Sequence, residues 1–484
     1  MISDVYAIKH ENVSYPIDNF NPSSIYPEYP FGDSEISDTK NEVYEMIREL
    51  FKVRGLDEDN YDTPSWNPLG EYVKPGMTVV LKPNWVDHAN SNKSYHFTGN
   101  EMDCLITNTS VIRAVCDYCI IALKGKGKII ICDAPIQDCE IDVLWKKAKI
   151  YDLIKFYSNK GISVSIEDLR AEQRVHNKLG VKKETRIIGG DDILVQMDTN
   201  TAFKGLNNCV YNVPNYDYKI TNKYQHGDTH IYSISKTILK ADIIFNICKP
   251  KCHRYAGITA ALKNCVGMVT HKETIPHRRF GSVEEGGDSY SKKSKVKKEI
   301  DKVLIKQARY ENEGKTFLAS ISRLEYGVLY YLRKALKEDS SIKGVWNGND
   351  TIWRTILDLN YVVRYADKSG KIQKHPQRQV INIGDMIIAG QHNGPLSPEP
   401  KPLGMVLFSE DAAAFDFTVA KIMGFDYSPM PLFKNIASGN SWMKYENAIV
   451  HSNIKEFNGL LDQIETSVDW HLIPHDGWKN LPIK

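Results

Sequence analysis

The stretch HRYAGITAALKN, residues 253–264, places His253 and Lys263 at the two ends of a small apolar run. Thr259 is a candidate N-cap for a short helix that carries Lys263 in its first turns. A helix N-terminus and apolar neighbours both disfavour an ammonium group, so we expect the pKa of Lys263 to be lowered. Such an amine is a candidate base, nucleophile or cofactor anchor, and the alternative is an ordinary solvated lysine.

Five apolar runs along the chain each end at or next to a charged residue. Near-continuous apolar runs are typical of strands that are buried on both faces of a parallel sheet, with helices as the crossovers. We therefore expect an α/β fold of mostly parallel sheets flanked by helices, arranged as two lobes with a cleft between them. The runs are MTVVL (77–81), KIIIC (128–132), DIIFNIC (242–248), VINIG (380–384) and GMVLFS (404–409).

Polar side chains that follow these runs are candidates for substrate binding, because ligands of open α/β sheets bind beyond the carboxyl ends of the strands. Lysine and asparagine there suit an anionic or hydroxyl-bearing ligand. The alternatives are ordinary strand exits and, for Asp133, the capping of a helix. The candidates are Lys82, Asn84, Asp133, Arg254, Asn264, His392 and Asn393.

A second set of residues offers ligands for a divalent metal. It consists of His271, Asp385, Asp411 and Asp416. Asp411 is also a natural N-cap for the helix that ends near Gly424. Asp416 lies on a small-residue helix face and has a base as its alternative partner. Both interpretations stay open.

The pattern along the chain predicts four segments. Residues 1–70 form an N-terminal arm, in which KNEVYEMIRELFKVRGL spaces its apolar residues as one helical stripe. Residues 71–280 form a first α/β lobe. Residues 281–310 form a mobile basic loop, for which the alternative is a solvated loop that runs into a surface helix. Residues 311–484 form a second α/β lobe with a C-terminal tail.

Composition excludes several classes of protein. The 484 residues carry a net charge of +2, which provides no global field for nucleic acid or an anionic membrane. No signal peptide and no transmembrane run is expected. Nine cysteines without a leader indicate reduced thiols in the cytoplasm. Because the ferredoxin spacing is missing, an iron–sulfur cluster is not expected, and we interpret Cys116 and Cys119 as core residues.

Several stretches resemble the bacterial and archaeal family of domain of unknown function 362. They are LKPNWV, TNTSVIRAV, CDAP, KPKCHRYAGITAALKNCVG, DLN at 358–360, GDMIIAGQHNGPLSPEPKPLG and SEDAAAFDFTVAKIMG. The resemblance implies an architecture more than a reaction, because the activity of the family is not established. Many relatives carry an additional ferredoxin module that is missing here.

The segment HRYAGITAALKNCVG is also similar to a part of the nickel-pincer lactate racemases. That likeness implies proton transfer by His253 and a cofactor held covalently by Lys263. A nearby metal-binding histidine of those enzymes corresponds to His271 or His277 at an uncertain register. We do not predict a nickel cofactor from it.

The leading hypothesis is a cytoplasmic enzyme for acid/base chemistry, of the isomerase, epimerase or lyase type, on a small anionic or sugar-like substrate. His253 would be the general acid/base and Lys263 its electrophilic or covalent partner. A divalent metal and a homo-oligomer are compatible with the sequence. The alternatives are a non-catalytic ligand- or metal-binding protein and a redox protein related to the ferredoxin-fused relatives.

Overall fold

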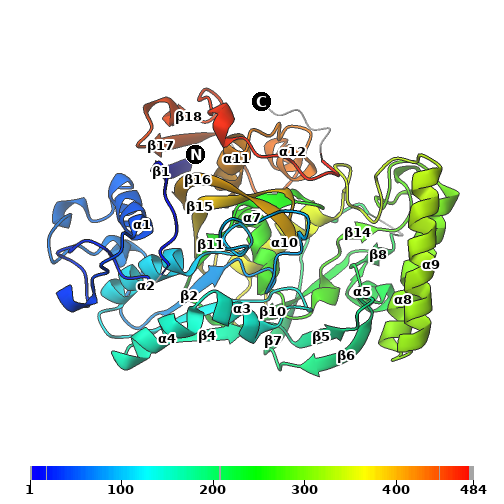
Figure 1. Ribbon diagram of the computed structural model, residues 1–484, viewed down its shortest axis with the longest axis horizontal. Helices are drawn as coiled ribbons and strands as arrows, with labels where there is room; N and C mark the ends of the chain where they lie inside the picture. Colours follow the sequence, from blue (N-terminus) through cyan, green and yellow to red (C-terminus); the bar gives the residue numbers. More distant parts are fainter. Residues whose placement is uncertain (1–2, 18, 207–208, 446, 479–484) are drawn as a thin grey trace.

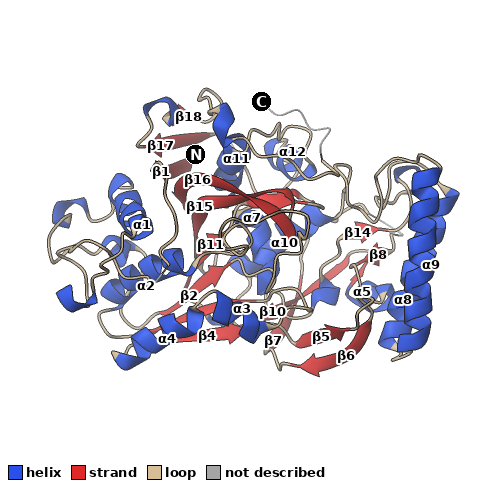
Figure 2. Ribbon diagram, in the orientation of Figure 1, coloured by secondary structure: helices blue, strands red, loops and turns tan. Residues whose placement is uncertain are grey.

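One large mixed sheet runs through the centre of the molecule, and helices cover both of its faces (Figures 1 and 2). The computed structural model describes residues 3–17, 19–206, 209–445 and 447–478. The strands along the sheet, in spatial order, are β18 (Gly459–Leu460), β17 (Ala448–Ser452), β1 (Ser3–Lys9), β16 (Ser397–Ser409), β15 (Gln379–Asn393), β11 (Ile243–Cys248), β2 (Thr78–Pro83), β3 (Lys128–Asp133) and β4 (Val164–Asp168).

Smaller strands extend or flank this sheet. The hairpin of β12 (Lys251–His253) and β13 (Gly257–Thr259) joins it through a contact between β12 and β15. The other small strands are β5 (Glu172–His176), β6 (Lys182–Ile187), β7 (Asp192–Gln196), β8 (Tyr211–Asn212), β9 (Gln225–His226), β10 (Thr229–Ser235) and β14 (Arg278–Arg279).

The predicted α/β class and the mostly parallel pairing are confirmed. The strands β15, β11, β2, β3 and β4 are parallel neighbours, and all six residues of β11 are buried, as the apolar run predicts. The fifth apolar run differs, because β16 pairs with β15 in the antiparallel direction. Its carboxyl end, with Glu410 and Asp411, therefore lies at the opposite edge of the sheet from the ends of β2, β3 and β11.

The two faces of the sheet carry alternate residues of each strand. Val79 and Leu81 of β2 pack in a core with α1, α2 and α4, whereas Val80 packs on the other face with α6 and α10. The helices are α1 (Glu42–Val53), α2 (Thr109–Leu123), α3 (Ile141–Lys147), α4 (Ile150–Asn159), α5 (Tyr218–Tyr224), α6 (Lys236–Lys240), α7 (Ala261–Asn264), α8 (Lys295–Asn312), α9 (Thr316–Ala335), α10 (Ile352–Tyr365), α11 (Ala412–Ile422) and α12 (Pro431–Ala437).

The predicted segment boundaries do not divide the sheet. The N-terminal segment contains the expected helix α1, capped by Asn41, but it also contributes β1, which lies between β16 and β17. Both predicted lobes supply strands to the same sheet, with β11 beside β15. The second half of the basic segment 281–310 forms nearly all of α8, which packs against α9 at one end of the molecule (Figure 1).

In the part of the chain that the structure describes, no helix has both the length and the apolar character needed to cross a membrane.

A fully buried ion pair lies in the middle of the sheet, and Tyr15 of the N-terminal segment is bonded to it. Lys249, directly after β11, lies 2.9 Å from Asp385 in β15, and neither side chain is exposed. Tyr15 donates its hydroxyl proton to Asp385 at 2.5 Å, and the backbone N–H of Asn108 donates to it at 2.8 Å. Asp385 was predicted at a strand end as a metal ligand, but β15 continues past it and its oxygens already accept three hydrogen-bonding groups.

We predict that Lys249→Met lowers the free energy of unfolding by about 3–5 kcal/mol, because it leaves a buried carboxylate without its cation. Chemical denaturation followed by fluorescence measures this change. The double variant Lys249→Met/Asp385→Asn should lose clearly less than the sum of the two single variants. Additive losses would show that the two groups are not coupled.

Candidate active site

A cavity of about 220 Å³ lies at the carboxyl ends of β2, β3 and β11. Asn84 follows β2, Asp133 ends β3, and Lys251 follows β11, as expected for ligand binding at strand ends. The other lining residues that can do chemistry are His253, Arg254, Lys263, Asn264, Lys272 and His277. The structure therefore brings both predicted catalytic residues together with four predicted binding residues.

The short helix α7, which carries Lys263, is held from α11 by a carboxylate. Asp416 accepts hydrogen bonds from the backbone N–H groups of Ala261 at 2.7 Å and Leu262 at 3.3 Å. The predicted cap was Thr259, and this prediction is wrong, because Ala260 precedes the helix and no cap side chain of its own bonds to it. Asp416 thus supplies the cap from a distant segment and is fully occupied by backbone donors.

Two buried asparagines hold the carbonyl groups of the same helix. The side chain of Asn246 in β11 donates to the carbonyl oxygen of Ala261, and that of Asn360 in α10 donates to the carbonyl oxygen of Leu262, both at 2.9 Å. Satisfied buried amides of this kind fix a backbone in one position. The Cα of Lys263 is therefore set by β11, α10 and α11 together.

The amine of Lys263 is buried without a partner. The residue is 8% exposed, and within the described residues its Nζ makes no hydrogen bond or ion pair. Burial, followed by the charges of Arg254 and Lys82, lowers the pKa of Lys263 to about 7. The predicted lowering by desolvation is supported, and the charges of Arg254 and Lys82, which were not predicted, add to it.

A second cation faces the cavity without an acid beside it. The Nε of Arg254 is buried and has no hydrogen-bond partner, and no carboxylate in the described ranges forms an ion pair with this guanidinium. The ring of Tyr255 lies beside it, with its centre 5.1 Å from Cζ. Lys263 is buried and Arg254 is partly buried, and cations without a partner in such positions are costly, so the two together mark a place for a bound anion.

The hydrogen bonds of His253 define its tautomer. Its Nδ1 accepts from the backbone N–H groups of Tyr255 and Ala256, each at 3.1 Å. A nitrogen that accepts from N–H donors carries no proton, so neutral His253 must carry its proton on Nε2. Burial and the charge of Lys263 hold its pKa well below the ordinary value. The geometry thus favours a neutral hydrogen-bond donor, whereas we predicted a general acid/base.

His277 has the opposite tautomer. Its Nδ1 lies 2.8 Å from the carbonyl oxygen of Ile275, which only accepts, so Nδ1 carries the proton and Nε2 keeps its lone pair. Burial and the charge of Lys263 lower the pKa of His277 to about 3. The sequence offered His277 only through an uncertain register with another family, because nothing in its local pattern places it beside Lys263.

A buried ion pair lies at the cavity, and its acidic member, Asp133, is part of the lining. Lys82 lies 2.7 Å from Asp133, and Asp133 also accepts from the backbone N–H groups of Trp85 and Ala134. A Cβ at Gly267 would lie 2.0 Å from the Asp133 carboxylate, so only glycine fits there. Lys82 and Asp133 are therefore held by each other and serve as scaffold.

A chain of amides extends from this pair along the cavity. The side-chain oxygen of Asn264 accepts from Lys82 at 3.2 Å and from Asn84 at 2.8 Å. The oxygen of Asn84 then accepts from Lys251 at 2.6 Å. Burial and the charge of Lys249 lower the pKa of Lys251 to about 7.

Lys272 supports the cavity wall next to Asp133. Its Nζ donates to the carbonyl oxygens of Ala134, Val269 and Val266 at 2.9, 3.1 and 3.3 Å. Lys272 and Lys251 were not among the predicted site residues, although each lies in a basic stretch around the predicted centre. Such a stretch does not reveal which of its lysines face the interior.

Two predicted binding residues lie outside the cavity lining. His392, near the end of β15, is 2.9 Å from Glu399 and 3.6 Å from Asp476. Asn393 donates to Asp476 at 3.2 Å. These residues form a polar cluster on the long arm of β15 and β16, beyond the body of the sheet.

The four predicted metal ligands do not form a group anywhere in the described residues. His271 is 3.8 Å from Asp192, and Asp411 caps α11 through the N–H groups of Ala413 and Ala414. Their separation follows from the antiparallel direction of β16 and from the continuation of β15 past its predicted end.

Comparison with known proteins identifies one family. The family described as Domain of unknown function (DUF362) matches residues 189–421, which confirms the predicted resemblance for this segment. The segment contains β11, α7, His277 and α11, whereas the loops after β2 and β3 precede it. The chain matches no curated protein and no solved structure. The likeness to lactate racemases stays a prediction.

We predict that Lys263→Met raises the free energy of unfolding at pH 7, because methionine removes a buried amine that has no partner. The unfolded chain protonates this lysine below about pH 10.4, and the folded chain only below about pH 7. The gain, at most about 5 kcal/mol, should be constant below pH 7 and shrink as the pH rises toward 10. Denaturant titrations at several pH values test this dependence, and a loss of stability at pH 7 would contradict the assignment.

A second prediction concerns the tautomer of His253. In ¹⁵N-histidine-labelled protein, its Nε2 should remain protonated and its Nδ1 unprotonated between about pH 5 and 8. Long-range ¹H–¹⁵N correlation spectra distinguish the two nitrogens, and His253→Asn assigns the signals. His277 should show the reverse pattern in the same spectra. A protonated Nδ1 in His253 would exclude the hydrogen bonds described above.

Proposed function

We propose that this chain, which carries the DUF362 domain over residues 189–421, is an enzyme for proton-transfer chemistry on a small anionic substrate. The observation that carries the proposal is the amine of Lys263, which lines a cavity, has no partner among the described residues and has a pKa lowered to about 7. A general base is most effective when its pKa lies near the working pH.

The charges around the cavity support an anion as its occupant. In the described part of the chain, no carboxylate forms an ion pair with Arg254 or Lys263, and the buried acid of the lining, Asp133, is already paired with Lys82. A bound carboxylate or phosphate would supply the missing negative charge. A cavity of about 220 Å³ lies below the usual range for drug-sized ligands, so it fits a small metabolite.

The arrangement supports one specific sequence of events. The neutral amine of Lys263 removes a proton from a carbon next to a carbonyl or carboxylate group, so that the C–H bond breaks and an N–H bond forms. The electron pair moves onto the oxygen, which accepts a hydrogen bond from Nε2–H of His253. The resulting ammonium pairs with the newly charged oxygen, which favours the transfer in a buried site.

The product of the reaction depends on where Lys263 returns the proton. Delivery to the other face of the carbon would invert its configuration, and loss of a neighbouring group would give a lyase reaction. His277, with a free lone pair on Nε2, would accept a hydrogen bond from a substrate hydroxyl group, and Arg254 would donate to a substrate carboxylate. These contacts support a hydroxy acid or a sugar acid as the substrate class.

We predict that the protein exchanges carbon-bound hydrogen of such an acid with solvent. A panel of small 2-hydroxy acids, sugar acids and their phosphate esters is incubated with the protein in D₂O, and deuterium uptake is followed by NMR. Lys263→Ala should abolish exchange, because no other unpaired amine lines the described part of the cavity. The rate should rise through about pH 7, as Lys263 loses its proton.

The control variant is Lys126→Ala, which changes an exposed lysine in a turn and should leave exchange intact. Lys263→Arg separates charge from basicity, since arginine keeps the positive charge but does not deprotonate. Exchange that persists in Lys263→Ala would overturn the assignment of the base. Tight binding of an acid by the wild type without any exchange would instead favour a non-catalytic anion-binding protein.

A further inference from the structure

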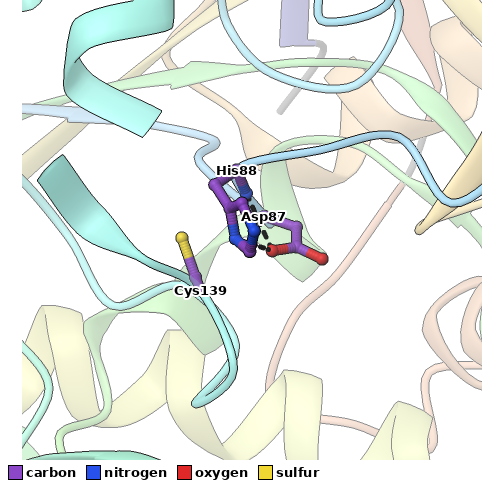
Figure 3. A group of neighbouring side chains, drawn as sticks. All are labelled: Asp87, His88 and Cys139. Atoms are coloured by element: carbon purple, nitrogen blue, oxygen red, sulfur yellow. Dashed lines mark hydrogen bonds and ion pairs between the residues drawn. The ribbon is translucent and has the colours of Figure 1, made fainter. Parts of the chain in front are cut away.

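A group of three potential metal ligands lies beside the cavity but is not part of its lining. Asp87 and His88 lie on the loop after β2, and Cys139 lies on the loop after β3 (Figure 3). Because β2 and β3 are parallel neighbours, their carboxyl-end loops meet at the same edge of the sheet. The fold thus brings together residues that are about fifty positions apart in the sequence.

The three side chains are close enough to share one ion. One ligand atom from each lies within 4.8 Å of the other two, and this group is the one cluster of its kind in the described residues. Asp87 is 8% exposed and Cys139 is fully buried, whereas His88 is partly open to solvent. An ion could therefore enter past His88 and be enclosed by the other two.

The contacts of His88 favour metal binding. Its Nδ1 lies 2.9 Å from Asp87 Oδ1 and also 3.1 Å from the backbone nitrogen of Glu140, although a ring nitrogen offers either one proton or one lone pair. Because the backbone N–H of Glu140 donates to Nδ1, neutral His88 carries its proton on Nε2, and the lone pair of Nδ1 faces the Asp87 carboxylate. A cation held by both acceptors would supply the positive charge that this contact lacks.

We propose that Asp87, His88 and Cys139 form a binding site for a zinc-like divalent cation. Thiolate, imidazole and carboxylate together suit Zn²⁺, whereas Mg²⁺ and Ca²⁺ require oxygen ligands. On binding, the Cys139 thiol releases its proton to solvent and a sulfur–metal bond forms.

The surroundings tolerate the added positive charge. Arg170, which donates to the carbonyl oxygen of Cys139 at 2.9 Å, is itself paired with Asp168 at 2.7 Å. Asp138 lies next to Cys139 in the chain and 3.4 Å from His176, whose Nδ1 is buried and has no hydrogen-bond partner. Asp138 and His176 are not part of the group of three, but the Asp138 carboxylate adds negative charge near Asp87.

The site would connect metal binding to the cavity. Val86 and Asp138 line the cavity, and each is adjacent in the chain to a residue of the metal group. A bound ion would tie the loops after β2 and β3 together and fix this side of the cavity. The inference does not depend on the proposed reaction, because metal binding is measured directly.

The test is titration of the metal-free, full-length protein with Co²⁺ and Zn²⁺. We expect one equivalent of Co²⁺ to give a sulfur-to-metal charge-transfer absorption, which Zn²⁺ then displaces. Cys139→Ala should abolish this absorption, and His88→Gln should weaken Zn²⁺ binding at least about tenfold, as measured by competition with a chelator. Cys209→Ser and His226→Gln are matched controls, and they should bind like the wild type.

Three results would overturn the proposal. The first is the lack of any Zn²⁺ binding above that of the Cys139→Ala variant. The second is an absorption that survives in Cys139→Ala, which would assign it to another cysteine. The third is unchanged Zn²⁺ affinity in His88→Gln, a variant at a partly exposed position where the fold should be retained.

Discussion

Buried positive charge must be compensated, and this need determines the contacts at the carboxyl ends of β2, β3 and β11. Lys82 and Lys249 each lie beside a buried aspartate, and Lys251 and Lys272 donate to amide and carbonyl oxygens. Each of these partnerships joins different strands or loops, so the same contacts that neutralise the lysines also align the ends of β2, β3 and β11. Lys263 has no such partner among the described residues. Its burial therefore lowers the stability of the fold at the candidate site.

Much of the fold could be predicted from the sequence, because apolar runs report burial on both faces of a strand. The runs VINIG and GMVLFS show that strand direction could not be predicted in the same way. The two runs look alike, yet β15 is parallel to β11 and β16 is antiparallel to β15. The direction of β16 depends on the turn after Asn393 and on which strand lies beside β16. A local sequence pattern indicates neither of these. The misplacement of Asp385 and Asp411 as metal ligands follows from this.

The candidate site was predictable in part for a similar reason. His253 and Lys263 could be selected because a small apolar run separates them and a predicted strand precedes them. Their chemical states could not be predicted, since the proton on Nε2 of His253 depends on two backbone N–H groups turned back toward its ring. The position of His277 depends on the packing of a loop that begins after α7. Tertiary contacts therefore decide which histidine donates and which accepts.

The place of β1 has a consequence for how the chain is made. This strand, residues Ser3–Lys9, pairs with β16 on one side and β17 on the other, and both follow it by almost four hundred residues or more. During synthesis its backbone N–H and C=O groups have no partner in this sheet until the residues of β16 and β17 have been added. Pairing over such sequence distances is slow, so this part of the sheet should form late in folding. Until then, the two unpaired edges of β1 are open to pairing with other chains, which favours aggregation.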